Sequence, residues 1–183
     1  MNIEIPKVSK EFEALDFHQV DTSSDITTTV LDNGSVKEVA KQSYGYVVRL
    51  SPKNSYFIII KQYYKNGGIK EKGVLFNSGF FKAGNWYRYN EKGELVNEEN
   101  NDKGFEFDFN KVYEYLRTQH IDLTIGHIEL YSGFHTTIEK DIEGKHATWV
   151  IRWLKEPQVV EEIILDGTNG KLLTRRNIKR GES

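Results

Sequence analysis

The stretch YYKNGGIKEKG, residues 63–73, has the pattern of a strand, a tight corner and a second strand. Aromatic and β-branched residues favour pleated strands, and Asn66-Gly67-Gly68 supplies the residue types that tight turns select. The corners at Asn33-Gly34 and Lys92-Gly93 are similar, because in all three the glycine is followed by one residue and then an aliphatic residue. Repeated corners of this kind predict a meandering antiparallel sheet. At Asn33-Gly34 we expect a two-residue turn in which both residues have positive φ.

Around these corners the chain divides into three regions. Residues 1–25 form an N-terminal segment, in which Phe12 and Leu15 lie at helical spacing and predict a short amphipathic helix over residues 9–17. Residues 26–105 carry the hairpins of the meander. Residues 106–183 combine a helix signal with further strand patterns. The last two regions either share one core or form two.

The strongest helix signal lies near residues 110–119. Phe109, Val112 and Leu116 fall on one stripe at the 3.6-residue period, and Asp108 or Asn110 can cap the start of the helix. Strand patterns follow at residues 123–131, 136–142, 146–154, 159–165 and 171–175. The predicted fold class is therefore α+β, mainly antiparallel β-sheet built as a meander of hairpins, with this one principal helix.

Composition excludes several classes of protein. The formal net charge is −2 over 183 residues, which argues against a general nucleic-acid binder. The chain contains no cysteine, so disulfides and thiolate metal sites are impossible. The longest apolar run, YFIII at residues 56–60, is too short to cross a bilayer. Since the first 25 residues contain no apolar stretch of the export type, we expect a cytoplasmic protein, or a periplasmic one if an export signal has been removed.

No catalytic signature is visible. The five histidines do not show the close spacing of a local metal site, and the two Ser-Gly-Phe corners lack the surroundings of a nucleophile elbow. Neighbouring carboxylates such as Glu98 and Glu99 point to opposite faces of a strand and cannot share a proton. We expect no catalytic residue, no metal, no cofactor and no enzyme activity. A deep pocket containing two or more histidines would indicate an enzyme instead.

The hairpins resemble the MORN-type repeats of bacterial antitoxin and immunity proteins. In that unit two aromatics precede Asn-Gly, an aliphatic residue, Lys-Glu and a glycine, and Gly-x-Trp follows. The matching positions here are Tyr63, Tyr64, Asn66, Gly67, Ile69, Lys70, Glu71 and Gly73, continued by Gly84, Trp86, Tyr89, Gly93 and Leu95. The resemblance implies a protein that binds a cognate bacterial toxin and blocks its active site.

An acidic run lies directly after these hairpins. Between residues 91 and 108 seven acidic residues stand against two lysines. Such a run is either solvated surface or a face that meets a basic partner. The predicted partner-binding residues are Glu94, Glu98, Glu99, Asp102 and Glu106, with Trp86 and Tyr87 as aromatic anchors. We expect charge reversal at Glu98, Glu99 and Asp102 to slow association and to leave folding intact.

The C-terminal part resembles a PepSY-type module. That family has a helix ahead of its sheet and ends in a strand, an aspartate, a short turn and Gly-Lys-aliphatic. The matching positions are Trp149, Val150, Ile151, Ile163, Leu165, Asp166, Gly170, Lys171 and Leu172. The alternative function that this resemblance implies is an envelope module that inhibits or binds a secreted enzyme or a small ligand. The oligomeric state is left open by the sequence.

Overall fold

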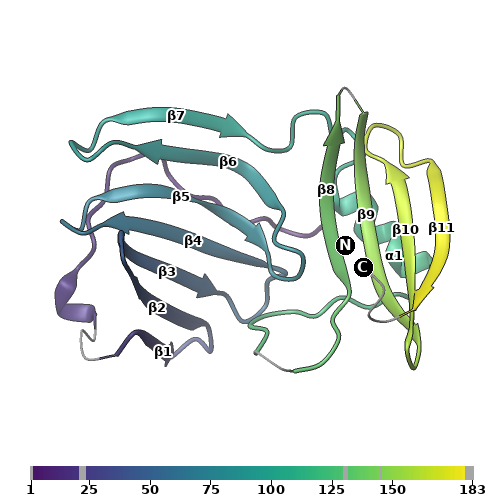
Figure 1. Cartoon of the computed structure of the whole chain (residues 1–183), viewed down its shortest axis with the longest axis horizontal. Helices are drawn as coiled ribbons and strands as arrows, with labels where there is room; N and C mark the ends of the chain where they lie inside the picture. Colours follow the sequence, from purple (N-terminus) through teal and green to yellow (C-terminus); the bar gives the residue numbers. More distant parts are fainter. Residues whose placement is uncertain (1, 21–23, 130–131, 145, 180–183) are drawn as a thin grey trace.

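The glycine corners join neighbouring strands of one seven-stranded antiparallel sheet, which lies beside a second sheet of four strands (Figure 1). The computed structural model describes residues 2–20, 24–129, 132–144 and 146–179. The strands of the first sheet follow one another in sequence order: β1 (Ile26–Val30), β2 (Val36–Gln42), β3 (Gly45–Ser51), β4 (Phe57–Tyr64), β5 (Ile69–Phe76), β6 (Lys82–Tyr89) and β7 (Leu95–Asn100). The predicted meander is confirmed.

The three similar corners adopt one geometry. In each corner, the residue three positions before the glycine makes two backbone hydrogen bonds of 2.8 to 3.0 Å. Its N–H donates to the carbonyl of the residue after the glycine, and its carbonyl accepts from the glycine N–H. These residues are Leu31 with Gly34, Tyr64 with Gly67 and Asn90 with Gly93. Only the glycine has positive φ, between 77° and 85°, so each is a three-residue loop with a glycine bulge. The two-residue turn predicted at Asn33-Gly34 is therefore wrong. Asn33 stays outside the left-handed region, and its side chain accepts a hydrogen bond from the N–H of Ser35.

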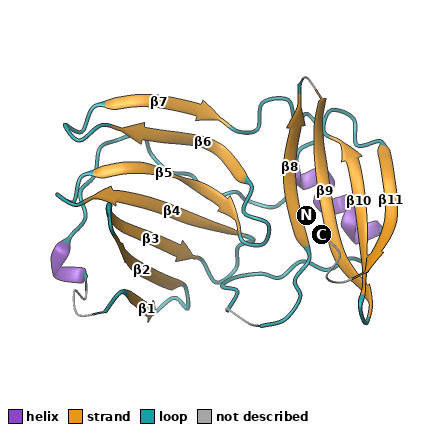
Figure 2. Cartoon of the chain, in the orientation of Figure 1, coloured by secondary structure: helices purple, strands orange, loops and turns teal. Residues whose placement is uncertain are grey.

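The second sheet follows the predicted helix. Helix α1 (Phe109–Thr118) precedes β8 (Thr137–Glu143), β9 (His146–Glu156), β10 (Val159–Asp166) and β11 (Leu172–Lys179), in the spatial order β11-β10-β9-β8. The side chain of Asp108 caps α1 by accepting the N–H of Lys111. Figure 2 shows α1 against one face of this sheet. The α+β fold class, mainly antiparallel with one principal helix, is confirmed.

The strand predicted over residues 123–131 is absent from its described part, residues 123–129; residues 130 and 131 lie outside the described residues. The connection there is held by a side chain, because Asn77 donates to the carbonyls of Thr124 and Gly126. Two backbone carbonyls of this connection are therefore hydrogen-bonded without a neighbouring strand.

One apolar cluster joins the two sheets. It takes Phe57, Val74, Phe76 and Ala83 from the first sheet, Phe81 from the β5–β6 connection, Phe109, Val112 and Leu116 from α1, and Ile138, Ala147, Trp149, Ile151, Ile163 and Leu165 from the second sheet. The ring of Phe81 lies edge-on to that of Trp149, with 5.2 Å between the ring centroids. The end of the first sheet is thus buried against the α1-covered face of the second.

An irregular N-terminal strap, residues 3–20, crosses one face of the first sheet. Its backbone forms bridges to the β4–β5 corner, since Leu15 N–H donates to Gly67 and Ile69 N–H donates to Glu13. The helix predicted over residues 9–17 is therefore wrong. Only the 3₁₀ turn η1 (Phe17–Gln19) is helical, because the backbone groups that a helix would pair internally are used on the sheet.

Candidate partner-binding surface

Strand β7 is an outer edge of the first sheet, along the top of Figure 1. It pairs only with β6, and all six of its residues are exposed. Its outer side therefore presents backbone N–H and C=O groups that no neighbouring strand of the sheet satisfies. A strand that buries no side chain adds little to the core, and its residues are available for contact with another molecule.

Three predicted carboxylates lie on this edge or in the corner that leads into it, and we call the three together the acidic edge: Glu94 in the corner, and Glu98 and Glu99 on β7. Glu98 is opposite Tyr87 and Glu99 opposite Trp86, so the two carboxylates point to opposite faces of the sheet. Glu94 accepts a hydrogen bond from the side chain of Asn90 at 2.7 Å, and Glu98 accepts one from Asn85 at 3.2 Å. No cation of the described residues forms an ion pair with any of the three.

Asp102 has a structural role instead. One carboxylate oxygen accepts the Gly84 N–H at 3.0 Å, and the other lies 2.7 Å from Nζ of Lys140 on β8. Lys140 also donates to the carbonyls of Lys82 and Asn101. Burial lowers the pKa of the Lys140 ammonium, although Asp102 acts in the opposite direction. The prediction that charge reversal at Asp102 leaves folding intact does not fit this geometry, because the change would remove the partner of a largely buried cation.

Glu106 lies beyond this contact, in the connection that leads to α1. The residue is exposed, and its backbone carbonyl accepts a hydrogen bond from Nζ of Lys111 at 2.6 Å. It belongs to the connection between the two sheets and not to β7. The five predicted carboxylates therefore do not act as one group: three form the acidic edge, one joins the sheets and one precedes the helix.

The two aromatic residues predicted as anchors are buried. Trp86 is 4% exposed and Tyr87 7%. The indole of Trp86 covers Gly73, where an added Cβ would come within 2.2 Å of the ring, and its Nε1 donates to the Val74 carbonyl at 3.1 Å. Tyr87 packs on the opposite face, in a cluster that includes Val8 of the strap. Neither ring is presented to a partner as the sequence predicted, because Trp86 is covered on one face of β6 and Tyr87 on the other.

Sequence reasoning missed the apolar groups that are exposed. Leu95 and Val96 of β7 are 42% and 56% exposed, beside the acidic residues. Phe80, in the β5–β6 turn, is 61% exposed and has φ of +58°, which is unusual for a bulky residue. The exposed aliphatic pair could have been found from sequence, since a hairpin strand without an apolar alternation has no face to bury. Nothing in the local sequence of Phe80 indicates its exposure.

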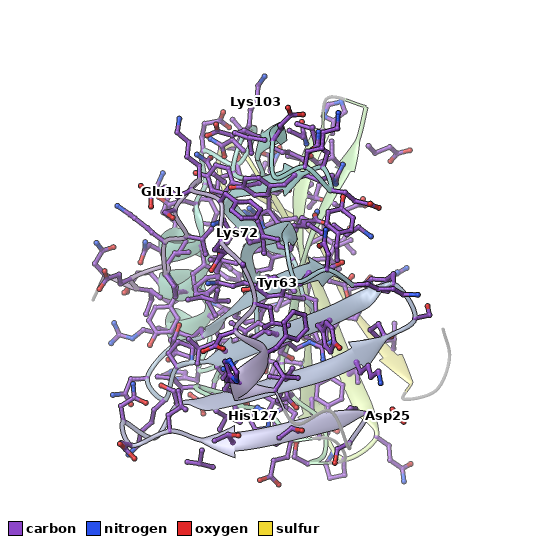
Figure 3. All side chains as sticks on the ribbon, turned by 90° about the vertical axis from the view of Figure 1, so that its left-hand side faces the viewer. Glu11, Asp25, Tyr63, Lys72, Lys103 and His127 are labelled. Carbon is purple, nitrogen blue, oxygen red and sulfur yellow. The ribbon has the colours of Figure 1, made fainter. Side chains whose placement is uncertain are left out.

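Away from the acidic edge, an ionic contact fixes the strap to the face of the first sheet. The Glu13 carboxylate lies 2.6 Å from Nζ of Lys61 and 2.9 Å from Nζ of Lys72. Lys72 also donates to the Glu11 carbonyl, and Figure 3 labels these two residues. The Lys72 side chain is only 2% exposed. Burial alone would raise the pKa of Glu13, but the two lysines outweigh it and hold that pKa below its ordinary value. We call this contact the Glu13 clamp.

A cavity of about 370 Å³ lies between the strap and the sheet, lined mainly by apolar side chains such as Leu15, Leu50 and Ile59. The buried hydroxyl of Tyr63 borders it, and burial raises the pKa of that hydroxyl. This cavity contains no histidine. Among the residues that the structure describes, no group of three or more His, Asp or Glu side chains could hold a metal ion.

Among the residues that the structure describes, one serine contacts a histidine, but the geometry of this contact does not activate a nucleophile. Ser132 Oγ lies 2.7 Å from Nε2 of His135 and donates to the carbonyl of Glu129 at 2.5 Å. Because a hydroxyl has one proton, the histidine must donate in the first contact. In the neutral imidazole Nδ1 then accepts from Thr124 Oγ1, which lies 2.7 Å away. An imidazole that donates to a serine is not its general base, so the contact stabilises the loop.

No helix within the described ranges is long and apolar enough to span a membrane. A scan of family models, a search of curated proteins and a search of solved structures each found no match, so the resemblances to MORN-type repeats and to PepSY modules remain predictions from residues.

Proposed function

We propose that this chain is an immunity or antitoxin protein, which neutralises a cognate bacterial toxin by covering its active site with the acidic edge. The observation that carries the proposal is β7 itself, a free edge strand whose six residues are all exposed. Its carboxylates form no ion pair with a described cation, so their charge is available to another molecule. The MORN-like pattern of the hairpins that lead into β7 supports the same function.

The proposed binding to the toxin would combine electrostatic and apolar contacts. An active site that acts on nucleic acid is basic, and an acidic surface accelerates association with it and disfavours acidic competitors. Leu95 and Val96 add exposed apolar area directly beside Glu98 and Glu99. Exposed backbone groups along β7 can also pair with an extended segment of the partner. The edge thus combines charge, apolar contact and backbone hydrogen bonding.

The experiment uses a toxin-domain protein encoded beside this gene, co-expressed with the chain and then measured for association and dissociation rates. We expect the double variant E98K/E99K to lower the association rate by about tenfold or more at low salt and to abolish protection of growth. The control E143K/E156K makes the same change of charge at exposed residues of the second sheet. Equal rates for both double variants would exclude β7 as the interface.

A second candidate function is the PepSY-like module, which inhibits or binds a secreted enzyme. It is favoured by the order of elements, since α1 comes directly before four antiparallel strands. The same experiment separates the two functions. Binding that survives E98K/E99K and is lost after changes on the second sheet would favour the PepSY-like module.

A further inference from the structure

The two sheets end in free edges of opposite charge. The acidic edge belongs to β7, and the other is β11, the last strand of the second sheet, which pairs only with β10. The stretch of residues 171–180 that contains β11 has five basic residues and no acidic one. Figure 1 shows β7 along one side of the first sheet and β11 at the far end of the second, so the two edges cannot pair within one chain.

The two strands also correspond in residue type. β7 has the sequence LVNEEN, and β11 begins LLTRRN. Both start with two exposed aliphatic residues: Leu95 and Val96 are 42% and 56% exposed, and Leu172 and Leu173 are 45% and 50% exposed. Each then continues with one polar residue, two charged residues of one sign and an asparagine. The charges are the only systematic difference between the two strands.

We propose that the β7 edge of one copy of this chain pairs with the β11 edge of another, joining the first sheet of one molecule to the second sheet of the next. An antiparallel arrangement with Glu98 opposite Arg176 places Glu99 opposite Arg175 and Val96 opposite Ile178. Antiparallel pairing is slightly more stable per residue than parallel pairing. Because neighbouring residues of a strand point to opposite faces, one ion pair forms on each face of the joined sheet.

The arginines keep donors for this contact. Arg176 uses Nε and Nη2 on Glu162, and Arg175 uses Nε on Glu161 and Nη2 on Gln119. A guanidinium has five N–H groups, and Nη1 of neither arginine makes a hydrogen bond with a described residue. The bonds to Glu161 and Glu162 hold both side chains in place, which reduces the entropy lost when they bind a carboxylate of a second copy.

The contact is heterologous, because two different edges meet. Like charges oppose the two symmetric alternatives, β7 with β7 and β11 with β11. Each added copy leaves one acidic and one basic edge free, so association proceeds head to tail and gives chains or rings. The proposed toxin surface is covered in this state. Self-association and toxin binding then compete, although the pairing itself does not depend on the proposed function.

Sedimentation velocity of the full chain tests the pairing without any toxin. We expect the wild-type protein to associate increasingly with concentration at low salt and to dissociate at high salt, because exposed charges are screened. The variant E98R/E99R removes the acidic edge but keeps β11. Alone it should associate at least about tenfold more weakly than the wild type.

Mixing gives the sharper result. An excess of E98R/E99R should cap wild-type molecules through its intact β11 and reduce their assemblies to one-to-one pairs. The control E143R/E156R carries the same charge change and should associate like the wild type. The proposal is overturned if the wild type stays monomeric at all concentrations, if E98R/E99R associates normally, or if E98R/E99R does not bind the wild type.

Discussion

The two sheets cover their inner faces by different means. The second sheet is covered by α1, which buries Phe109, Val112 and Leu116 against it. The first sheet is crossed by the irregular strap, which the Glu13 clamp holds through two lysines of the sheet. Apolar side chains have no charge to screen or titrate, whereas a clamp of charges responds to both salt and pH. One chain therefore contains a cover held mainly by apolar packing and another that includes an ionic contact.

The largest loss of stability is expected from a substitution in α1, the helical cover of the second sheet. Leu116 is fully buried, and Leu116→Ala should lower the free energy of unfolding by about 3–4 kcal/mol, since it leaves a cavity in the cluster shared by both sheets. Urea unfolding monitored by tryptophan fluorescence measures this. Arg117→Ala on the exposed side of α1 is the control and should stay within about 0.5 kcal/mol. A loss below about 1 kcal/mol for Leu116→Ala would mean that α1 is not a rigid part of the core.

The next largest loss of stability is expected at the Glu13 clamp. Glu13→Gln leaves the buried ammonium of Lys72 without its carboxylate, and we expect a loss of about 2 kcal/mol, reduced from the fully buried case because Glu13 and Lys61 are partly exposed. Glu11→Gln is a matched control, since Glu11 contacts Lys72 through its backbone carbonyl alone. Hydrogen exchange of the strap amides should speed up in the first variant only. Equal protection in both would show that the carboxylate does not hold the strap.

Acid should act on the same contact. The folded pKa of Glu13 is below its ordinary value of 4.5, so its stabilising contribution is complete above that value and is lost as pH falls through the folded pKa. Burial alone would raise the pKa values of Glu161 and Glu162 on the second sheet, but their hydrogen-bonded and basic partners outweigh it and hold both pKa values below the ordinary one. The stability of the wild type should therefore fall in acid. Glu13→Gln should show a shallower fall, measured by urea unfolding at a series of pH values, and identical slopes would contradict the assignment.

The corners give a smaller effect that isolates the contact with the strap. Gly67 has φ of +85°, and an added Cβ would lie 2.6 Å from Phe17 of the strap. Gly144 has φ of +62° and no atom within 4 Å of an added Cβ. Gly144→Ala should cost about 1 kcal/mol for backbone strain alone. Gly67→Ala should cost about 2 kcal/mol, and its excess over Gly144→Ala measures the displaced strap. Thermal unfolding of the two variants tests this, and equal losses would show that Phe17 moves aside freely.

The smallest effect on folding is expected at the acidic edge. E98K/E99K should change stability by no more than about 0.5 kcal/mol, because both carboxylates are exposed and make no ion pair with a described residue. Asp102→Asn should instead lose about 1–2 kcal/mol by weakening the contact with Lys140. Chemical denaturation of both proteins checks the difference. A large loss for E98K/E99K would show that β7 has a structural role that its exposure does not indicate.

Much of the fold could be predicted from local pattern. The period of Phe109, Val112 and Leu116 indicated the helix, and three glycines indicated the three corners, because φ of +77° to +85° is open to glycine at no steric cost. The turn type at Asn33-Gly34 could not be predicted, since two-residue and three-residue loops select the same residues. The strap could not be predicted either: spacing favoured a helix, but its backbone bonds to β5 lie more than 50 residues away in sequence.

The candidate site also has features that could be predicted from the sequence and features that could not. Charge and residue type belong to the chain alone, so the acidic run and its position after the hairpins were visible in the sequence. Exposure depends on neighbours that are distant in sequence: Gly73 and Val74 cover one side of Trp86, Val8 packs with Tyr87, and Lys140 engages Asp102. Local periodicity determines which elements form. Only the packing of one element on another decides which side chains remain free for a partner.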